Sequence, residues 1–282
     1  MPSCTKAKNP RGIEIIFTEE PHEYYSLLPL STGVVSPTGA IWRGDEKSRS
    51  VDNFIRASYT SGTTFVHKFC PPFDPDGKIA LRAAQKKGVS VDQIKFEWKQ
   101  RSAEACEMGT RVHATCEDFF YDRPCRFQPQ SEKERRIMQA GITAAQVFKS
   151  KYRIMGVEQL VGDLDCQLAG SIDLLAYDPA TDTWWILDWK TNAKIEKDNT
   201  FKTGQFMKDP IAHLKNCNFV HYALQLNTYK YLLYAAAYVP RMAKIRCGII
   251  HLTEAGPIFY EMPDYSNEVR DMLIYILEQP PF

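Results

Sequence analysis

Residues 170–192 read GSIDLLAYDPATDTWWILDWKTN, a pattern typical of two β-strands joined by a tight turn. Both strands are rich in apolar residues, yet the first carries Asp173 and the second carries Asp188. An ionised carboxylate in an apolar strand costs free energy unless a partner neutralises it. The two aspartates are therefore the residues that any account of this chain has to explain.

The spacing of the two aspartates predicts that they face each other across the hairpin. If the turn is centred between Ala180 and Thr181, Asp173 and Asp188 stand directly opposite, with Cβ atoms about 5 Å apart. Like charges at that separation destabilise a sheet, and burial makes the repulsion worse. A divalent cation between them would remove the penalty, and oxygen ligands of this kind favour Mg²⁺ or Mn²⁺ over zinc.

Lys190 completes the pattern. Side chains alternate along a strand, so Ile186, Asp188 and Lys190 share one face of the second strand. A cation that activates water, beside an ammonium that offsets developing negative charge, suits the hydrolysis of a phosphodiester. An isolated Asp-x-Lys is more often an ordinary surface ion pair, so the prediction depends on the complete G-x-x-D and D-x-K pattern.

These motif residues resemble the core motif of the PD-(D/E)xK nuclease superfamily. More narrowly, Gly170 and Asp173 followed by Asp188, Lys190 and Thr191 resemble the G-x-x-D … D-x-K-T form of its RecB-like exonuclease branch. The resemblance implies a restriction-endonuclease-like α/β (or α+β) core, in which a central mixed sheet is flanked by helices. It also implies hydrolysis that leaves a 5′-phosphate.

An upstream segment, MGTRVHATCED at residues 108–118, places His113 and Glu117 one helical turn apart. A helical histidine is more often structural than a ligand. The segment nevertheless resembles the G-T-x-x-H-x-x-x-E motif of the RecB-like branch, which begins here at Gly109 and Thr110. That resemblance implies that His113 binds the catalytic metal, and we expect a structural or supporting role for Glu117.

A downstream segment places Gln225 and Tyr229 one helical turn apart, as in the Q-x-x-x-Y motif of the same branch. The resemblance implies that Gln225 contacts the water or phosphate at the metal site and that Tyr229 contacts the DNA backbone. The alternative is an amphipathic helix with the tyrosine in the core. On the strand before Asp173, Glu158 is expected to face the same side as Asp173 and to assist catalysis.

Together these assignments make one hypothesis about the site. One or two Mg²⁺ or Mn²⁺ ions are expected to be held by His113, Asp173, Asp188 and the main-chain carbonyl of Trp189. The residues expected to take part in catalysis are Asp173, Asp188, Lys190, Glu158 and Gln225. Those expected to bind substrate are Gln225, Tyr229, Thr191 and Lys194. Because only Cys247 follows Tyr229, no iron–sulfur cluster is expected.

The order of the expected elements predicts the fold class. Helices fill most of residues 78–152, three strands occupy 155–191, and a helix that ends at Pro240 is followed by a hairpin and a terminal helix. This order predicts an α/β or α+β fold with a mixed sheet. Residues 109–282 are expected to form the nuclease core.

Residues 1–108 are expected to be strands and helices packed on that core, with one short strand or loop segment at 33–42. Residues 61–74 (SGTTFVHKFCPPFD), Trp98 and residues 104–120 together show a diffuse resemblance to exonucleases of phage and mitochondrial genome maintenance. That resemblance implies that these helices shape a passage for DNA. The two parts are expected to form one structural unit.

Composition limits the partners and the compartment. The 35 basic and 34 acidic residues give a net charge of +1, so any nucleic-acid binding has to come from local patches. The lysines of residues 194–215 are the candidate patch. No apolar run approaches the roughly 20 residues of a membrane span, the first residues lack the apolar core of a secretion signal, and the eight cysteines are scattered. We expect a cytoplasmic protein with free thiols.

The sequence thus predicts a Mg²⁺- or Mn²⁺-dependent DNA exonuclease that acts on DNA ends or single strands in replication, recombination or repair. Further partners would be replication or recombination proteins. Two alternatives stay open: a structure-specific endonuclease or RNA-directed nuclease on the same fold, and a non-catalytic nucleic-acid-binding assembly protein. The Q-x-x-x-Y pair argues against the former, and the intact Asp173, Asp188 and Lys190 argue against the latter.

Overall fold

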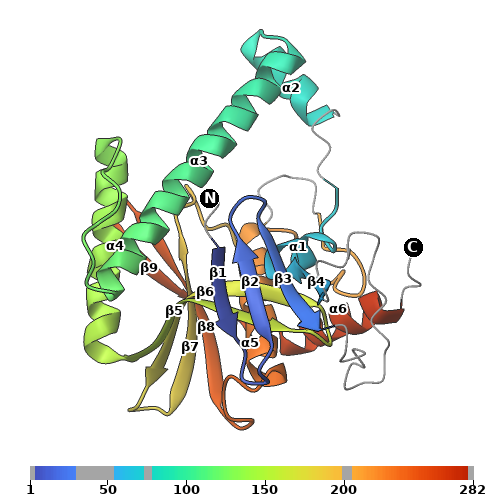
Figure 1. Cartoon of the computed structure of the whole chain (residues 1–282). Helices are drawn as coiled ribbons and strands as arrows, with labels where there is room; N and C mark the ends of the chain where they lie inside the picture. The colour runs from blue at the N-terminus through green and yellow to red at the C-terminus, as the bar shows by residue number, and fades with distance from the viewer. Residues whose placement is uncertain (1–3, 30–53, 73–77, 199–204, 279–282) are drawn as a thin grey trace.

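A computed structural model of the chain describes residues 4–29, 54–72, 78–198 and 205–278 (Figure 1). The segment expected at 33–42 and Lys202 of the lysine-containing loop lie outside these ranges. Within the described ranges, no helix combines the length and the apolar character that crossing a bilayer requires.

A nine-stranded sheet forms the centre of the molecule, with the order β1-β2-β3-β4-β6-β7-β8-β9 and β5 paired with β6. The strands are β1 (Cys4–Lys8), β2 (Glu14–Thr18), β3 (Glu23–Pro29), β4 (Phe54–Ser61), β5 (Arg153–Asp163), β6 (Leu168–Asp178), β7 (Thr183–Lys190), β8 (Lys244–Thr253) and β9 (Gly256–Glu261). The helices are α1 (Gly62–His67), α2 (Lys78–Lys87), α3 (Val91–Phe120), α4 (Glu132–Lys151), α5 (Asn218–Ala235) and α6 (Ser266–Glu278).

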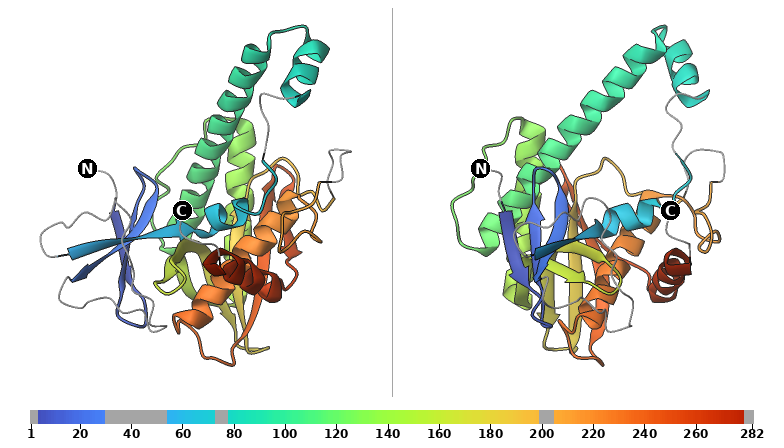
Figure 2. Two further views of the ribbon diagram at one scale, coloured as in Figure 1. Left: turned by 90° about the vertical axis from the view of Figure 1, so that its right-hand side faces the viewer. Right: turned by 45° about the vertical axis from the view of Figure 1, so that its right-hand side comes forward.

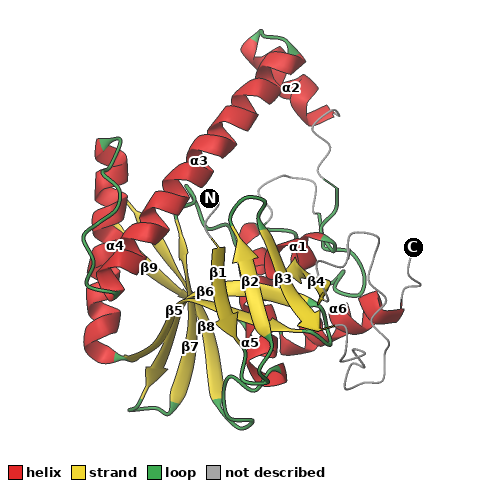
Figure 3. Ribbon diagram, in the orientation of Figure 1, coloured by secondary structure: helices red, strands yellow, loops and turns green. Residues whose placement is uncertain are grey.

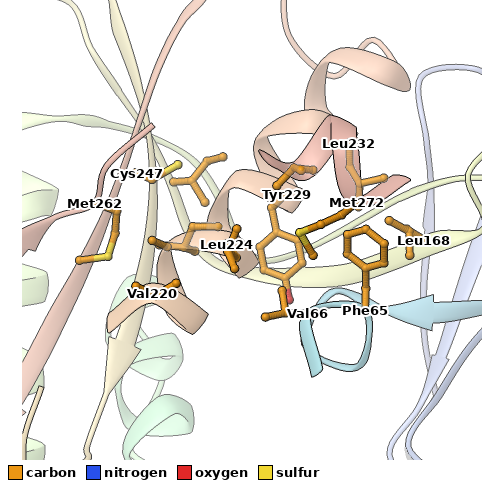
Figure 4. Packing of buried hydrophobic residues seen from close by; sticks show 14 of the residues in the cluster. Phe65, Val66, Leu168, Val220, Leu224, Tyr229, Leu232, Cys247, Met262 and Met272 are labelled. Atoms are coloured by element: carbon orange, nitrogen blue, oxygen red, sulfur yellow. The ribbon is translucent and has the colours of Figure 1, made fainter. Parts of the chain in front are cut away.

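Helices cover both faces of the central strands, as Figure 3 shows. One core cluster packs α1, α5 and α6 against β6, β7 and β8, with Tyr229 and Leu224 among its buried side chains (Figure 4). A second cluster packs α3 and α4 on the opposite face, around Leu187 and Trp189. The expected architecture, a mixed sheet flanked by helices, is confirmed.

The β6–β7 hairpin has the register that its sequence predicts, but the ladder ends one residue before the expected pair of Asp173 and Asp188, which are therefore not paired across the strands. Antiparallel pairs run from Asp178 opposite Thr183 to Leu174 opposite Leu187, which centres the turn between Ala180 and Thr181. The alternation of β7 is also as expected, because Ile186 packs in the cluster of α5 whereas Leu187 packs in the cluster of α3 and α4.

The sheet divides at Asp173. Strand β7 pairs with β6 only as far as Leu174, and β4 joins β6 in parallel at Leu168 and Ala169. Among the described strands, none pairs with β6 between these two contacts on that edge. On the other edge, Glu158 of β5 lies opposite Asp173, and its φ of +48° interrupts the ladder. Where the strands separate, side chains rather than a neighbouring strand form hydrogen bonds with the main chain of β7.

The N-terminal strands extend the sheet and pack on β5 and β6. Their cluster contains Ile15, Tyr24 and Tyr59 together with Leu160 and Ala169. Beyond the sheet, α3 rises away from the body and carries α2 at its outer end (Figures 1 and 2). Helix α3 runs unbroken across residues 108 and 109, so the two parts expected from the sequence share one helix.

Two helices begin where their sequence predicts, and one helix ends earlier than predicted. Ser90 and Ser131 cap α3 and α4, each accepting a main-chain N–H three residues on, from Gln93 and Glu134. The prediction that the helix of Gln225 ends at Pro240 is wrong, because α5 ends at Ala235. Ala237 takes a φ of +60°, and Tyr238 N–H donates to Leu233 O, which closes the helix before the proline is reached.

Gly170 leaves space for the ring of Tyr229. A Cβ at Gly170 would lie well inside van der Waals contact with Tyr229 Cε1, and one at Gly62 would lie 2.7 Å from the same atom. The ring is buried between two close backbone segments, so it has little room to withdraw. The motif glycine is therefore required by packing.

We predict that Gly170→Ala lowers the free energy of unfolding by about 2 kcal/mol, because the added methyl overpacks this contact. Gly109→Ala is the control, since its Cβ would meet Thr191 Oγ1 at an ordinary 3.5 Å within a helix, where alanine is favoured. Urea denaturation of both variants measures the difference. Equal stability of Gly170→Ala and wild type would contradict the assigned packing.

Candidate functional site

Three elements bring a compact donor group together at the division of the sheet. Helix α3 supplies His113, β5 supplies Glu158 and β6 supplies Asp173, and one ligand atom from each lies within 4.8 Å of the others. In the described part of the chain, this is the group whose side chains could hold a metal ion. Two residues predicted from separate motifs, His113 and Asp173, thus come together with Glu158.

Side chains bind both main-chain groups of Trp189, where β7 has left β6. The Trp189 N–H donates to Asp173 Oδ2 at 2.9 Å, and the Trp189 carbonyl lies 2.9 Å from His113 Nε2. Since a carbonyl oxygen only accepts, His113 Nε2 carries the proton. The other ring nitrogen, Nδ1, then directs its lone pair at Asp173 Oδ2, 3.2 Å away.

Two facing acceptors repel each other unless a positive charge lies between them. A proton on Asp173 would supply it, and so would a divalent cation. One imidazole nitrogen and carboxylate oxygens from Glu158 and Asp173 form a donor set that Mg²⁺ or Mn²⁺ can use. The residues present therefore fit a divalent ion, with the Trp189 carbonyl directly beside the donor group.

Asp188 and Lys190 form a second feature of the site. Lys190 Nζ lies 2.6 Å from Asp188 Oδ2, as expected for neighbours on one strand face. Asp188, which is 4% exposed, is not among the three residues of the compact donor group. The structure thus pairs Asp188 with the lysine, and its role as a metal ligand stays a prediction.

Burial dominates the protonation of the donor group. It raises the pKa of Asp173 well above its ordinary value, and the negative charge of Asp188 adds to the rise. Burial and then the charge of Asp173 raise the pKa of Glu158 to about 7. The pKa of His113 is lowered by burial despite the nearby carboxylates. A neutral imidazole and carboxyl groups that retain protons are the expected state of the metal-free protein.

Lys190 remains a cation in this environment. Burial alone would lower its pKa, but the carboxylates of Asp188 and Asp173 raise it above the ordinary value.

Glu158 is held in place by Ser171, whose hydroxyl donates to Glu158 Oε2 at 2.9 Å. The site therefore combines a charged lysine with carboxyl groups whose negative charge an ion would stabilise.

The Q-x-x-x-Y pair is also adjacent to the site, but its tyrosine is buried. Gln225 Nε2 donates to the Tyr229 hydroxyl at 3.1 Å, and Tyr229 is 4% exposed against Gly62 and Gly170. This position corresponds to the packing alternative for Tyr229. Its expected contact with the DNA backbone stays a prediction, and the half-buried Gln225 is the more accessible of the two.

The remaining predicted residues surround this centre. Thr191 lies beside Gly109 of α3, so the two motifs meet there. Lys194 is exposed and borders a groove of about 390 Å³ formed with Lys197, His251 and Tyr260. Glu117 forms ion pairs with arginines of the following loop, Arg123 and Arg126, in keeping with the structural role expected for it.

Three residues near the site escaped the sequence motifs. Ser171 could have been found from its position two residues before Asp173 on the same strand face. Tyr222 lies one helical turn before Gln225, and its ring centroid is 4.6 Å from Lys190 Nζ. Tyr24 of β3 lies close enough for Glu158 and Asp173 to add to the rise that burial causes in its pKa, and no local pattern pointed to it.

We predict that the metal-free protein loses stability as pH rises, through Glu158. In the unfolded chain Glu158 ionises near its ordinary pKa of 4.5, and in the folded protein near 7, so the folded form is favoured below this interval and that advantage is lost across it. The loss is on the order of 3 kcal/mol. Comparing the unfolding free energies of wild type and Glu158→Gln, in EDTA from pH 4 to 8, isolates it from the opposite contribution of His113.

Added Mg²⁺ or Mn²⁺ should stabilise the protein more at pH 8 than at pH 5, because the ligands have to lose their protons. Asp173→Asn should abolish this metal-dependent gain in thermal stability. A gain independent of pH, or one that persists in Asp173→Asn, would rule out the proposed donor group.

Comparison with known proteins agrees with this geometry. The family model of the PD-(D/E)XK nuclease superfamily matches residues 89–279, which is more than half of the chain. The matched part contains all three residues of the donor group. Among curated proteins, none matches the chain. Because the match spans α3 to α6, it covers the sheet strands that carry the acids and the lysine as well as the helix that carries His113. The chain therefore belongs to the PD-(D/E)XK nuclease superfamily.

Proposed function

We propose that the protein is a metal-dependent DNA exonuclease. The observation that carries the proposal is the donor group of His113, Glu158 and Asp173, placed next to the buried Asp188–Lys190 ion pair. The RecB-like motifs around His113 and Gln225 support the choice of exonuclease within the superfamily. We assign the activity to DNA replication, recombination or repair in the cytoplasm, as the sequence predicts.

Mg²⁺ or Mn²⁺ would be held by His113, Glu158 and Asp173, with Asp188 and the Trp189 carbonyl as the further ligands predicted from the sequence. When bound, the ion would supply acidification of water and neutralisation of charge at phosphorus. The protein's part is to keep the ligands in place. Ser171 fixes Glu158, and the N–H of Trp189 fixes Asp173.

Lys190 would act directly on the substrate. Its ammonium is buried enough to exclude most water, and it is held as a cation by Asp188. Placed beside the scissile phosphate, it would orient the attacking water and offset the charge that grows on the phosphoryl oxygens in the transition state. Gln225, whose amide is half-buried beside the site, would position the phosphate.

The substrate strand would be bound through its phosphates, without sequence readout. Lys194 and Lys197 stand at the groove that begins directly after β7, a few residues beyond Lys190. Thr191, between the lysine and the groove, is assigned a substrate contact as well. The outer helices α2 and α3 would help to shape the passage that leads DNA to the site.

We predict that wild type degrades end-labelled DNA in Mg²⁺ or Mn²⁺ and that EDTA abolishes the activity. Lys190→Ala and Asp173→Asn should each lower kcat by at least about 100-fold, since each removes a charge that acts at the reacting phosphate. Lys149→Ala, which breaks an exposed ion pair with Asp122, is the matched control and should leave kcat unchanged.

Substrate topology separates the alternatives. An exonuclease degrades linear DNA and leaves closed circular DNA intact, whereas an endonuclease cleaves both. Cleavage of circles would overturn the exonuclease assignment, and preference for RNA would overturn the assignment to DNA. Binding of DNA with no metal-dependent cleavage would point to an assembly protein.

We predict that Lys194→Ala weakens binding of single-stranded DNA while leaving kcat within about twofold of wild type. Because one phosphate contact is removed, the slope of log K against log salt concentration should fall by about 0.7. Titrations by fluorescence anisotropy at several salt concentrations, in EDTA, measure both changes. An unchanged slope would place the DNA away from this loop.

A further inference from the structure

The ammonium of Lys190 has an aromatic neighbour that no motif includes. Its Nζ lies 2.6 Å from Asp188 Oδ2 on one side and 4.6 Å from the centroid of the Tyr222 ring on another. Tyr222 belongs to α5, one turn before Gln225, so the two side chains lie on one face of this helix. The cation therefore contacts both a carboxylate and the face of an aromatic ring.

The ring of Tyr222 is itself held by a chain of hydrogen bonds. Its hydroxyl donates to Asn192 Oδ1 at 2.7 Å, and His251 Nε2 donates to the Asn192 main-chain carbonyl at 2.6 Å. His251 lies on β8 directly opposite Lys190 in the parallel β7–β8 ladder. This series of hydrogen bonds therefore begins at the ring that contacts Lys190 and ends at His251, on the strand paired with that of Lys190.

We propose that Tyr222 is a positioning residue for Lys190: its ring holds the ammonium against Asp188, and Asn192 and His251 lock the ring in place. The inference rests on the proposed role of Lys190 in hydrolysis.

The physical reason is the freedom of the lysine side chain. Four methylene groups give lysine many rotamers, and burying it in one of them costs free energy. The negative face of an aromatic ring attracts a cation, and the attraction grows when water is excluded, as it is around the largely buried Lys190. The ion pair with Asp188 fixes the distance of the Lys190 ammonium from one oxygen atom. The contact with the Tyr222 ring further restricts the positions that the ammonium can take. Lys190 is thereby prepared for the phosphate before substrate arrives.

Substitutions of Tyr222 separate the ring from the hydroxyl. Tyr222→Leu removes the ring, and we expect kcat to fall about tenfold with KM within about twofold of wild type. Tyr222→Phe keeps the ring, and kcat should return to within about threefold of wild type. Tyr231→Leu is the matched control, a half-buried ring on the same helix that contacts none of these residues, and it should leave kcat unchanged.

A ring-charge series isolates the cation contact from packing. Replacing Tyr222 with phenylalanine carrying successive fluorine atoms weakens the negative ring face with little change in shape. We expect log kcat to fall steadily along the series, while melting temperature stays constant. A kcat that does not depend on fluorination would overturn the inference even if Tyr222→Leu is impaired, since that loss would then be one of packing.

A measurement without turnover tests the contact itself. With ¹³C at the lysine Cε atoms, the Lys190 methylene signals should lie upfield through the ring current of Tyr222, with Lys190→Ala giving the assignment. The displacement should disappear in Tyr222→Leu and persist in Tyr222→Phe.

The outcomes distinguish the two proposals. Wild type that cleaves no DNA but shows the ring-current displacement overturns the proposed function, and with it any effect on catalysis. Wild type that cleaves DNA, with Tyr222→Leu at the wild-type kcat, overturns the inference alone.

Discussion

The hydrogen bond from the Trp189 N–H to Asp173 Oδ2 is the interaction on which the site depends. Strand β7 loses its partner on β6 after Leu187, and a buried N–H without an acceptor would be costly. Asp173 takes the place of the missing strand, and in doing so it brings a carboxylate next to His113. The same carboxyl group that completes the sheet thus belongs to the donor group, where burial raises its pKa. Asp173 Oδ2 thus both accepts the hydrogen bond of the Trp189 N–H and lies next to His113 Nδ1.

Much of this arrangement could be predicted from local patterns. The hairpin register followed from the turn, and the shared face of Asp188 and Lys190 followed from alternation along a strand. Bringing His113 to Asp173 required the motif resemblance, because no local rule relates residues on α3 and β6. The position of Asp188 outside the compact donor group, and the burial of Tyr229 against Gly62 and Gly170, depend on side-chain packing between elements. Packing of this kind cannot be predicted from the spacing of the motif residues along the sequence.

The buried acids of the site are expected to lower the stability of the folded protein when they are ionised. Three carboxyl groups, from Glu158, Asp173 and Asp188, lie at one point of a largely apolar sheet, and burial makes ionisation of the first two unfavourable. The surrounding packing has to compensate, and it does so with tight contacts such as that of Gly170 with the Tyr229 ring. The strands of the first 61 residues contribute as well, because they add Tyr24 and a separate apolar cluster next to β5 and β6. The β6–β7 hairpin, which carries two of the three acids, is thus supported by apolar clusters on both faces of the sheet and by the N-terminal strands.

Helix α3 links distant parts of the molecule mechanically. It is 30 residues long and unbroken, so it extends about 45 Å from its outer end beside α2 to the turn that follows Phe120. His113 is attached near the inner end of this rod. Because α3 is continuous and packs on α4, its orientation against the sheet determines where the imidazole lies relative to Asp173.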